Sequence, residues 1–224
     1  MTVYIEKPAV NLREELASLR NQGGYQEQQF YFDGLVTNGT FDTDTTGWTP
    51  TSGSLSVVDG WLRITASASP SFASTAIATE VGKVYKFTGE WRSNASDTWR
   101  LVAGTTAGNN NLASAASAPS GTADLIVVAT TTTTYISIRS VTGVTSGDWA
   151  EIDNISFFEV DANDDVIHTM PKGWKPKDVF EDGLLQREGA ANDYEVVYDG
   201  FDYFVKPTVA PSATTQTCVI GVKA

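Results

Sequence analysis

Short runs in which hydrophobic and polar residues alternate follow one another from about residue 37 to residue 160, and turn-forming clusters separate them. This alternation is the period of β-strands with one buried face. The clearest stretch is SLSVVDGWLRITA, residues 54–66, where two alternating runs flank Asp59-Gly60, a strong signal for a two-residue hairpin. Residues 83–93, 123–141 and 150–160 repeat the pattern. Strands at this spacing predict a β-sandwich or a barrel.

A helical period occurs only near the N-terminus, in NLREELASLRNQGG, residues 11–24. Leu12, Leu16 and Leu19 recur at helical spacing, and Asn11 with Glu14 can form a capping box. The pattern predicts an amphipathic helix of about three turns, which is marginal alone in water. Its leucine stripe is therefore expected to pack either on its own domain or on another subunit.

The residues before this helix, TVYIEKP, are expected to form an extended arm that can add to the edge of a sheet. Residues 1–34 then constitute an anchor segment. Its expected partner-binding residues are Tyr4, Ile5, Leu12, Leu16 and Leu19.

Two further segments follow the predicted sandwich. Residues 161–177 lose the alternation and gain charge, proline and glycine, which is typical of a linker. Strand-like runs return after it, with turn signals at Asp182-Gly183 and Asp199-Gly200. The expected fold is all-β, with an anchor segment (1–34), a jelly-roll or similar β-sandwich (35–160), a linker (161–177) and a small β-hairpin module (178–224).

Composition and charge narrow the function. The 224-residue chain carries a net charge of −12, which repels nucleic acid and anionic membrane surfaces. The single cysteine, Cys218, cannot form an intrachain disulfide. The N-terminal residues lack the apolar run of a secretory signal, and no stretch approaches the ~20 apolar residues of a membrane span. We therefore expect a protein that is made and assembled in a cytoplasm, without nucleic acid or membrane partners.

Catalytic groups do not converge in the sequence. The only histidine, His168, lies in the predicted linker without a nucleophile or second ligand at any motif spacing. Carboxylates are numerous, so chance proximity of two of them is expected. The protein is predicted not to be an enzyme and to need no catalytic cofactor.

Glycan binding is the candidate chemistry that the side chains favour, because sugars stack on aromatic rings and accept hydrogen bonds from arginine. The segment EWRSNASDTWRL contains two Trp-Arg pairs. The candidate glycan-binding residues are Trp91, Arg92, Trp99 and Arg100. The alternative is that both tryptophans belong to the core, since tryptophan is buried on average.

Several motifs resemble the jelly-roll carbohydrate-binding modules of bacterial xylanases and related glycan enzymes. The resemblance covers about residues 36–160 and rests on Asn38-Gly39-x-Phe41, Trp48, Gly82-x-x-Tyr85 and Asp153-Asn154-Ile155. It implies a jelly-roll β-sandwich. It also implies a structural Ca²⁺, for which Asp42 and Asp153 are the candidate ligands.

The flanking segments resemble virion proteins of tailed bacteriophages. Residues 178–224 are similar to a small β module of tail-fibre and other virion proteins, and KPAVNLREEL is similar to an N-terminal segment of marine phage structural proteins. The resemblance implies a non-enzymatic virion protein that decorates the capsid or forms a short head or tail fibre. It also implies a homo-oligomer such as a trimer, with other virion proteins as partners. The alternative is a glycan-binding adhesin module for attachment to host surface glycans.

Overall fold

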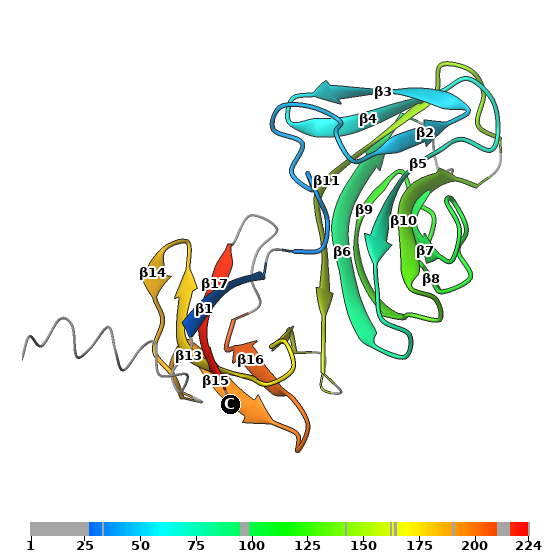
Figure 1. The fold of residues 1–224 in the computed structure, drawn as a ribbon. Helices are drawn as coiled ribbons and strands as arrows, with labels where there is room; N and C mark the ends of the chain where they lie inside the picture. The colour runs from blue at the N-terminus through cyan, green and yellow to red at the C-terminus, as the bar shows by residue number, and fades with distance from the viewer. Residues whose placement is uncertain are drawn as a thin grey trace, which may run out of the picture.

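The structure is a computed structural model that describes residues 27–32, 34–94, 99–141, 143–161, 163, 165–189, 191–209 and 216–223. The regular secondary structure in this part of the chain consists of β-strands, and these strands form two units (Figure 1). The predicted all-β fold is therefore confirmed. No helix with the length and hydropathy to cross a membrane occurs among these residues.

The larger unit is a sandwich of two five-stranded antiparallel sheets. Sheet I has the order β2 (Thr49–Thr51), β5 (Phe72–Ala78), β10 (Thr133–Ser140), β7 (Trp99–Gly104) and β8 (Ala113–Ser114). Sheet II has the order β3 (Gly53–Val58), β4 (Trp61–Ala66), β11 (Trp149–Glu159), β6 (Val84–Ser93) and β9 (Ser120–Val128).

The chain crosses between the two sheets at nearly every step. From β4 to β7 and again from β9 to β11, each strand belongs to the sheet opposite to that of the strand before it. This alternation is the topology of a jelly roll, in which two sheets are wound from hairpin-like pairs of strands. The expected jelly-roll β-sandwich is thus confirmed.

Alternation along the strands fills the space between the sheets. In β4, Leu62 and Ile64 point inward and are almost fully buried, while Trp61 and Arg63 point outward and are half-buried. Largest among the fully buried core side chains are Trp99, Phe41, Phe87 and Phe157. Burial of these faces supplies most of the stabilisation of such a sandwich.

Two turns explain why particular residues stand where they do. Asp59 and Gly60 both have positive φ, 52° and 81°, as a type I′ hairpin between β3 and β4 requires. Gly39 lies so close to the backbone of Ile155 that an added Cβ would stand 2.1 Å from its carbonyl oxygen. The hairpin predicted at Asp59-Gly60 is confirmed, and Phe41 is buried beside Trp48 at a ring distance of 5.5 Å.

The smaller unit consists of a four-stranded and a three-stranded antiparallel sheet. The four-stranded sheet has the order β1 (Glu27–Phe32), β17 (Thr217–Lys223), β13 (Trp174–Glu181) and β14 (Leu184–Leu185). The three-stranded sheet has the order β12 (His168–Thr169), β16 (Tyr203–Pro207) and β15 (Tyr194–Tyr198). The hydrophobic core between the two sheets contains the buried residues Met170, Val179, Tyr194, Val205 and Val219.

This unit recruits strands from segments to which the sequence assigns other roles. Residues 27–32, placed by the sequence in the anchor segment, form β1 and pair with β17 near the other end of the chain. Residues 161–177, placed in a linker, contain β12 and the start of β13. The anchor residues Tyr4, Ile5, Leu12, Leu16 and Leu19 lie outside the described residues, so their docking role stays a prediction.

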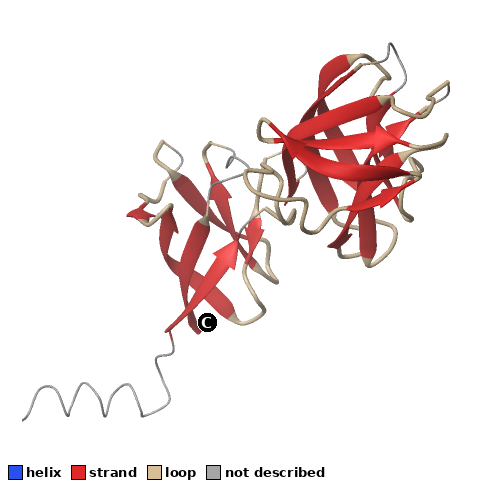
Figure 2. Cartoon of the chain, turned by 90° about the horizontal axis from the view of Figure 1, so that it is seen from above, coloured by secondary structure: helices blue, strands red, loops and turns tan. Residues whose placement is uncertain are grey.

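Two separate units are visible in both views (Figures 1 and 2), and Figure 1 shows that the chain passes from one to the other after β11. Val160 pairs with Val166 in an isolated bridge, and both side chains are buried in a small cluster with Phe158. Lys206 of the smaller unit forms ion pairs with Asp161 and Asp165, with 3.3 Å between its Nζ and Asp161 Oδ2. The connection is therefore part apolar and part ionic.

Candidate functional site

Both tryptophans that the sequence nominates for glycan stacking belong to the core. Trp91 is 4% exposed and Trp99 is fully buried between the sheets. The Nε1 of Trp91 donates a hydrogen bond to the carbonyl oxygen of Ala118 at 3.1 Å. A sugar cannot stack on a ring that is enclosed in this way, so these two positions match the core alternative that the sequence left open.

Arg92, in contrast, lies on the outer face of sheet II, in a row of charges that crosses three strands. It stands opposite Glu151 of β11, and Glu151 stands opposite Arg63 of β4. Glu151 accepts a hydrogen bond from Arg63 Nε at 2.7 Å, and its other carboxylate oxygen accepts a hydrogen bond from Arg92 Nε. The carboxylate is 1% exposed, whereas the side chains of Arg63 and Arg92 are 28% and 42% exposed.

Two tryptophans flank this row. The guanidinium of Arg63 lies over the ring of Trp149 at 4.3 Å, and that of Arg92 lies over the ring of Trp61 at 4.2 Å. Cation–π pairs of this geometry hold both partners in one orientation. We call the five residues Trp61, Arg63, Arg92, Trp149 and Glu151 the Trp-Arg face.

Hydrogen-bond capacity is left over on the Trp-Arg face. Two guanidinium groups carry about ten N–H donors, whereas one carboxylate offers about four acceptor positions. Arg63 and Arg92 share only Glu151 as an ionic partner among the described residues. Part of each guanidinium is therefore available to a ligand at the surface. Ser54, Ser56 and Thr65 add hydroxyl groups beside it on β3 and β4.

The two residues proposed as calcium ligands lie near each other. Burial raises the pKa of Asp153, and the neighbouring Glu90 and Asp42 carboxylates act in the same direction. Oδ1 of Asp153 is buried and has no hydrogen-bond partner among the residues that the structure describes. The described part of the chain nevertheless contains no group of three or more Asp, Glu, His or Cys side chains placed to hold a metal ion. The side-chain donor set therefore does not fit a metal by itself, and the calcium stays a prediction.

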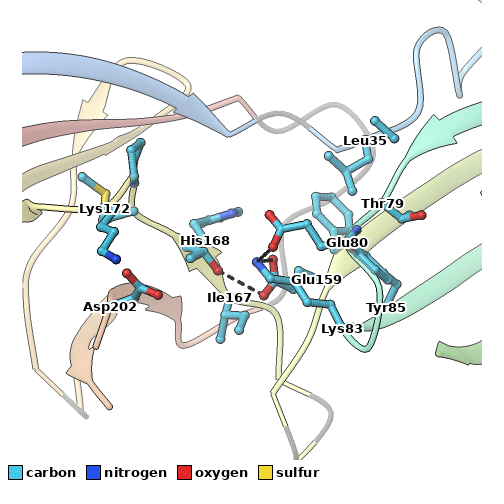
Figure 3. A pocket seen from close by; sticks show the side chains of 15 residues that line it. Leu35, Thr79, Glu80, Lys83, Tyr85, Glu159, Ile167, His168, Lys172 and Asp202 are labelled. Atoms are coloured by element: carbon cyan, nitrogen blue, oxygen red, sulfur yellow. Dashed lines mark hydrogen bonds and ion pairs between the residues drawn. The ribbon is translucent and has the colours of Figure 1, made fainter. Parts of the chain in front are cut away.

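A groove of about 580 Å³ lies where the two units meet (Figure 3). Lys83 crosses it, with its Nζ 3.0 Å from Glu159 Oε2 and 3.5 Å from Glu80 Oε2. Thr169 Oγ1 donates a hydrogen bond to Glu159 Oε1 at 3.0 Å, which ties the smaller unit to the sandwich. Burial lowers the pKa of His168 to about 4, so this imidazole is neutral at pH 7. Because Lys83 pairs with Glu80 and Glu159, these charged groups neutralise one another. We therefore assign the groove a structural role.

Comparisons with known proteins found similar solved structures but no matching sequence. No protein-family model and no curated protein match the chain. The TmCBM61 module in complex with β-1,4-galactotriose is 14% identical, with a TM-score of 0.44 and coverage of 58% of this chain and 100% of that chain. The N-terminal cellulose-binding domain of β-1,4-glucanase C from Cellulomonas fimi is 14% identical, with a TM-score of 0.42 and coverage of 58% and 99%.

A phage protein is also among the similar structures. The enzymatically active domain of tailspike protein 4 from bacteriophage CBA120 is 14% identical, with a TM-score of 0.41 and coverage of 57% of this chain and 21% of that chain. Likeness at this level concerns the arrangement of the chain and carries no ligand from one protein to another. The all-β fold and the jelly-roll sandwich of this chain therefore rest on its own strand order.

Proposed function

We propose that the protein is a non-catalytic glycan-binding module and that the Trp-Arg face is its binding surface. The observation that carries the proposal is the pair of half-buried tryptophans, Trp61 and Trp149, held by arginines on the outer face of one sheet. Indole rings and the apolar part of a guanidinium offer a flat surface to the C–H face of a sugar. The remaining N–H groups of Arg63 and Arg92 can donate to sugar hydroxyls.

Preorganisation strengthens this arrangement. The buried Glu151 fixes both guanidinium groups, so a ligand does not have to order them when it binds. A surface that is already ordered loses little conformational entropy on binding. Weak contacts with each sugar ring can then add up to useful affinity.

The test is a glycan array followed by calorimetric titration of the best oligosaccharide. Trp149→Ala is expected to weaken binding by about tenfold or more, the loss of one aromatic contact with its buried area. Trp174→Ala is the matched control, because Trp174 is also half-buried and carries a cation, Lys223, at 5.1 Å from its ring, but lies in the smaller unit. Equal affinity of all three proteins, or no glycan bound, would overturn the proposal.

A second candidate function is assembly into a virion of a tailed phage, as capsid decoration or as a short fibre. Its support is the resemblance of the terminal segments together with the apolar tip of the β15–β16 hairpin, where Phe201 is 87% exposed. The chain would attach through residues 1–34 and display the sandwich outward. Deletion of residues 1–24 should leave a folded protein that no longer co-purifies with particles; unchanged incorporation would contradict this role.

A further inference from the structure

The outer face of sheet I carries a pair of arginines that has no counterion within the described chain. Arg100 of β7 and Arg139 of β10 stand directly opposite each other in the antiparallel register. Residues that are directly opposite project to the same face and lie close together, and like charges in this position are destabilising. The repulsion is notable because acidic residues outnumber basic ones by 27 to 15 in this protein.

The two arginines differ from those on the opposite side of the sandwich. Arg63 and Arg92 share the buried carboxylate of Glu151. Arg139 Nη1 donates to the carbonyl oxygen of Gly108 at 2.9 Å, and no carboxylate pairs with it in the described part of the chain. Arg100 forms neither an ion pair nor a hydrogen bond there, and its Nε is buried without a partner.

An orphaned guanidinium N–H is costly, because its hydration is lost without a replacement. Such a group in a native structure calls for a partner such as a water, an ion or a ligand. Two arginines at opposite strand positions can direct N–H donors to the two oxygens of one carboxylate. The net charge of −12 disfavours extended polyanions such as nucleic acid, so a small anion fits the pair better than a polyanion does.

An aromatic side chain and a loop lie beside the arginine pair. Phe72 stands opposite Arg139 on β5 and is half-buried. The loop after β7 crosses this face at Gly108, whose N–H donates to Ser137 Oγ at 3.1 Å. An added Cβ at Gly108 would stand 2.7 Å from the ring of Phe72, so the loop lies directly on the sheet.

We propose that Arg100 and Arg139 form a binding site for the carboxylate of an acidic sugar, with Phe72 beside the sugar ring. The carboxylate would accept hydrogen bonds from both guanidinium groups and relieve their repulsion. This site lies on the sheet opposite the Trp-Arg face. Its assignment to a sugar rests on the proposed glycan-binding function, whereas the need for an anion rests on the arginine pair alone.

The experiment follows the Nε–H resonance of Arg100 by ¹⁵N NMR on the full chain while sodium glucuronate, glucose or sodium sulfate is added. Glucuronate is expected to shift this resonance and to raise the thermal midpoint, and glucose is not. Arg100→Gln should weaken glucuronate binding by about tenfold or more while leaving the ligand-free protein as stable as before or more stable. Arg187→Gln, which changes an exposed arginine of the smaller unit, should bind as the parent does.

Each result decides between the parts of the proposal. Absence of any anion-dependent shift at Arg100, or a large loss of stability in Arg100→Gln, would overturn the site and show that the pair is structural. Sulfate binding as tight as glucuronate binding would overturn the assignment to a sugar. Glucuronate binding that depends on Arg100, in a protein whose Trp149→Ala variant binds neutral glycans as the parent does, would support this site and reject the Trp-Arg face.

Discussion

The sandwich and the smaller unit are both antiparallel β-structures, but they close their cores in different ways. The sandwich is continuous in sequence, and its two sheets enclose large side chains such as Trp99, Phe87 and Phe157. The smaller unit is completed by β1, which precedes the sandwich, and its core contains few large side chains. A small β unit with little buried surface depends more on its neighbours for stability.

Exposed apolar residues show the same contrast. The smaller unit exposes Leu184, Leu185, Phe201 and Val209, each at 61% or more. On the sandwich, Ile126 and Val128 are about half exposed at the edge strand β9, and Val81, in the turn before β6, is 63% exposed. Such clusters mark contacts with other molecules more often when they are large and adjacent. Under the proposed function we expect a division of work, in which the sandwich would carry the ligand sites and the smaller unit would make protein contacts.

The largest expected effect tests whether the two units unfold separately. Phe157→Ala removes a fully buried ring that stacks on Tyr85 at 5.0 Å, and should destabilise the sandwich by about 3–5 kcal/mol. Calorimetry should then show one of two transitions shifted downward. Val219→Ala, in the core of the smaller unit, should shift the other transition. A single transition that moves in both variants would show that the junction couples the units into one cooperative structure.

A smaller effect should distinguish the units by pH. Burial holds the pKa of His168 at about 4, below its value of 6.5 in an unfolded chain. Between these values the unfolded state binds a proton that the folded state does not, so the unfolding free energy falls as the pH is lowered from about 6.5 to about 4. The loss attributable to this residue amounts to about 3 kcal/mol at most and levels off below that window.

The measurement compares the parent with His168→Gln by urea unfolding at several pH values. Stability of the parent should decline through the window, and that of the variant should decline less. The difference between the two proteins removes the contribution of carboxylates, which titrate in both. Parallel pH profiles would show that the imidazole is accommodated equally well in its charged form.

Local patterns in the sequence were enough to predict much of the sandwich. The turn at Asp59-Gly60 depends on two adjacent residues and their flanking alternation, and the structure confirms it. Phe41 and Trp48, which carry part of the resemblance to jelly-roll modules, lie in the core. These predictions succeed because each depends on neighbours within a few positions.

Pairings between distant segments could not be predicted in the same way. Nothing in residues 27–32 specifies that β17, almost two hundred positions later, is their partner. The Trp-Arg face likewise joins β4, β11 and β6, so Glu151 meets Arg63 only after the register of three strands is fixed. The outward position of Trp61 and Trp149 was a usable signal, because each lies next to a buried strand residue in an alternating run.

The smallest effect on stability should come from the tip of the β15–β16 hairpin. Phe201 is 87% exposed, so Phe201→Ser should change the unfolding free energy by no more than about 0.5 kcal/mol. The substitution should nevertheless weaken association with a protein partner or with a second copy, because it removes the largest apolar group at the tip. Sedimentation velocity over a range of concentrations measures self-association, and co-purification with particles measures assembly.

Ile126→Ser, which changes an exposed apolar residue of the sandwich, is the matched control. If Ile126→Ser reduces association and Phe201→Ser does not, the sandwich rather than the smaller unit makes the protein contacts, and the division of work between the units is reversed.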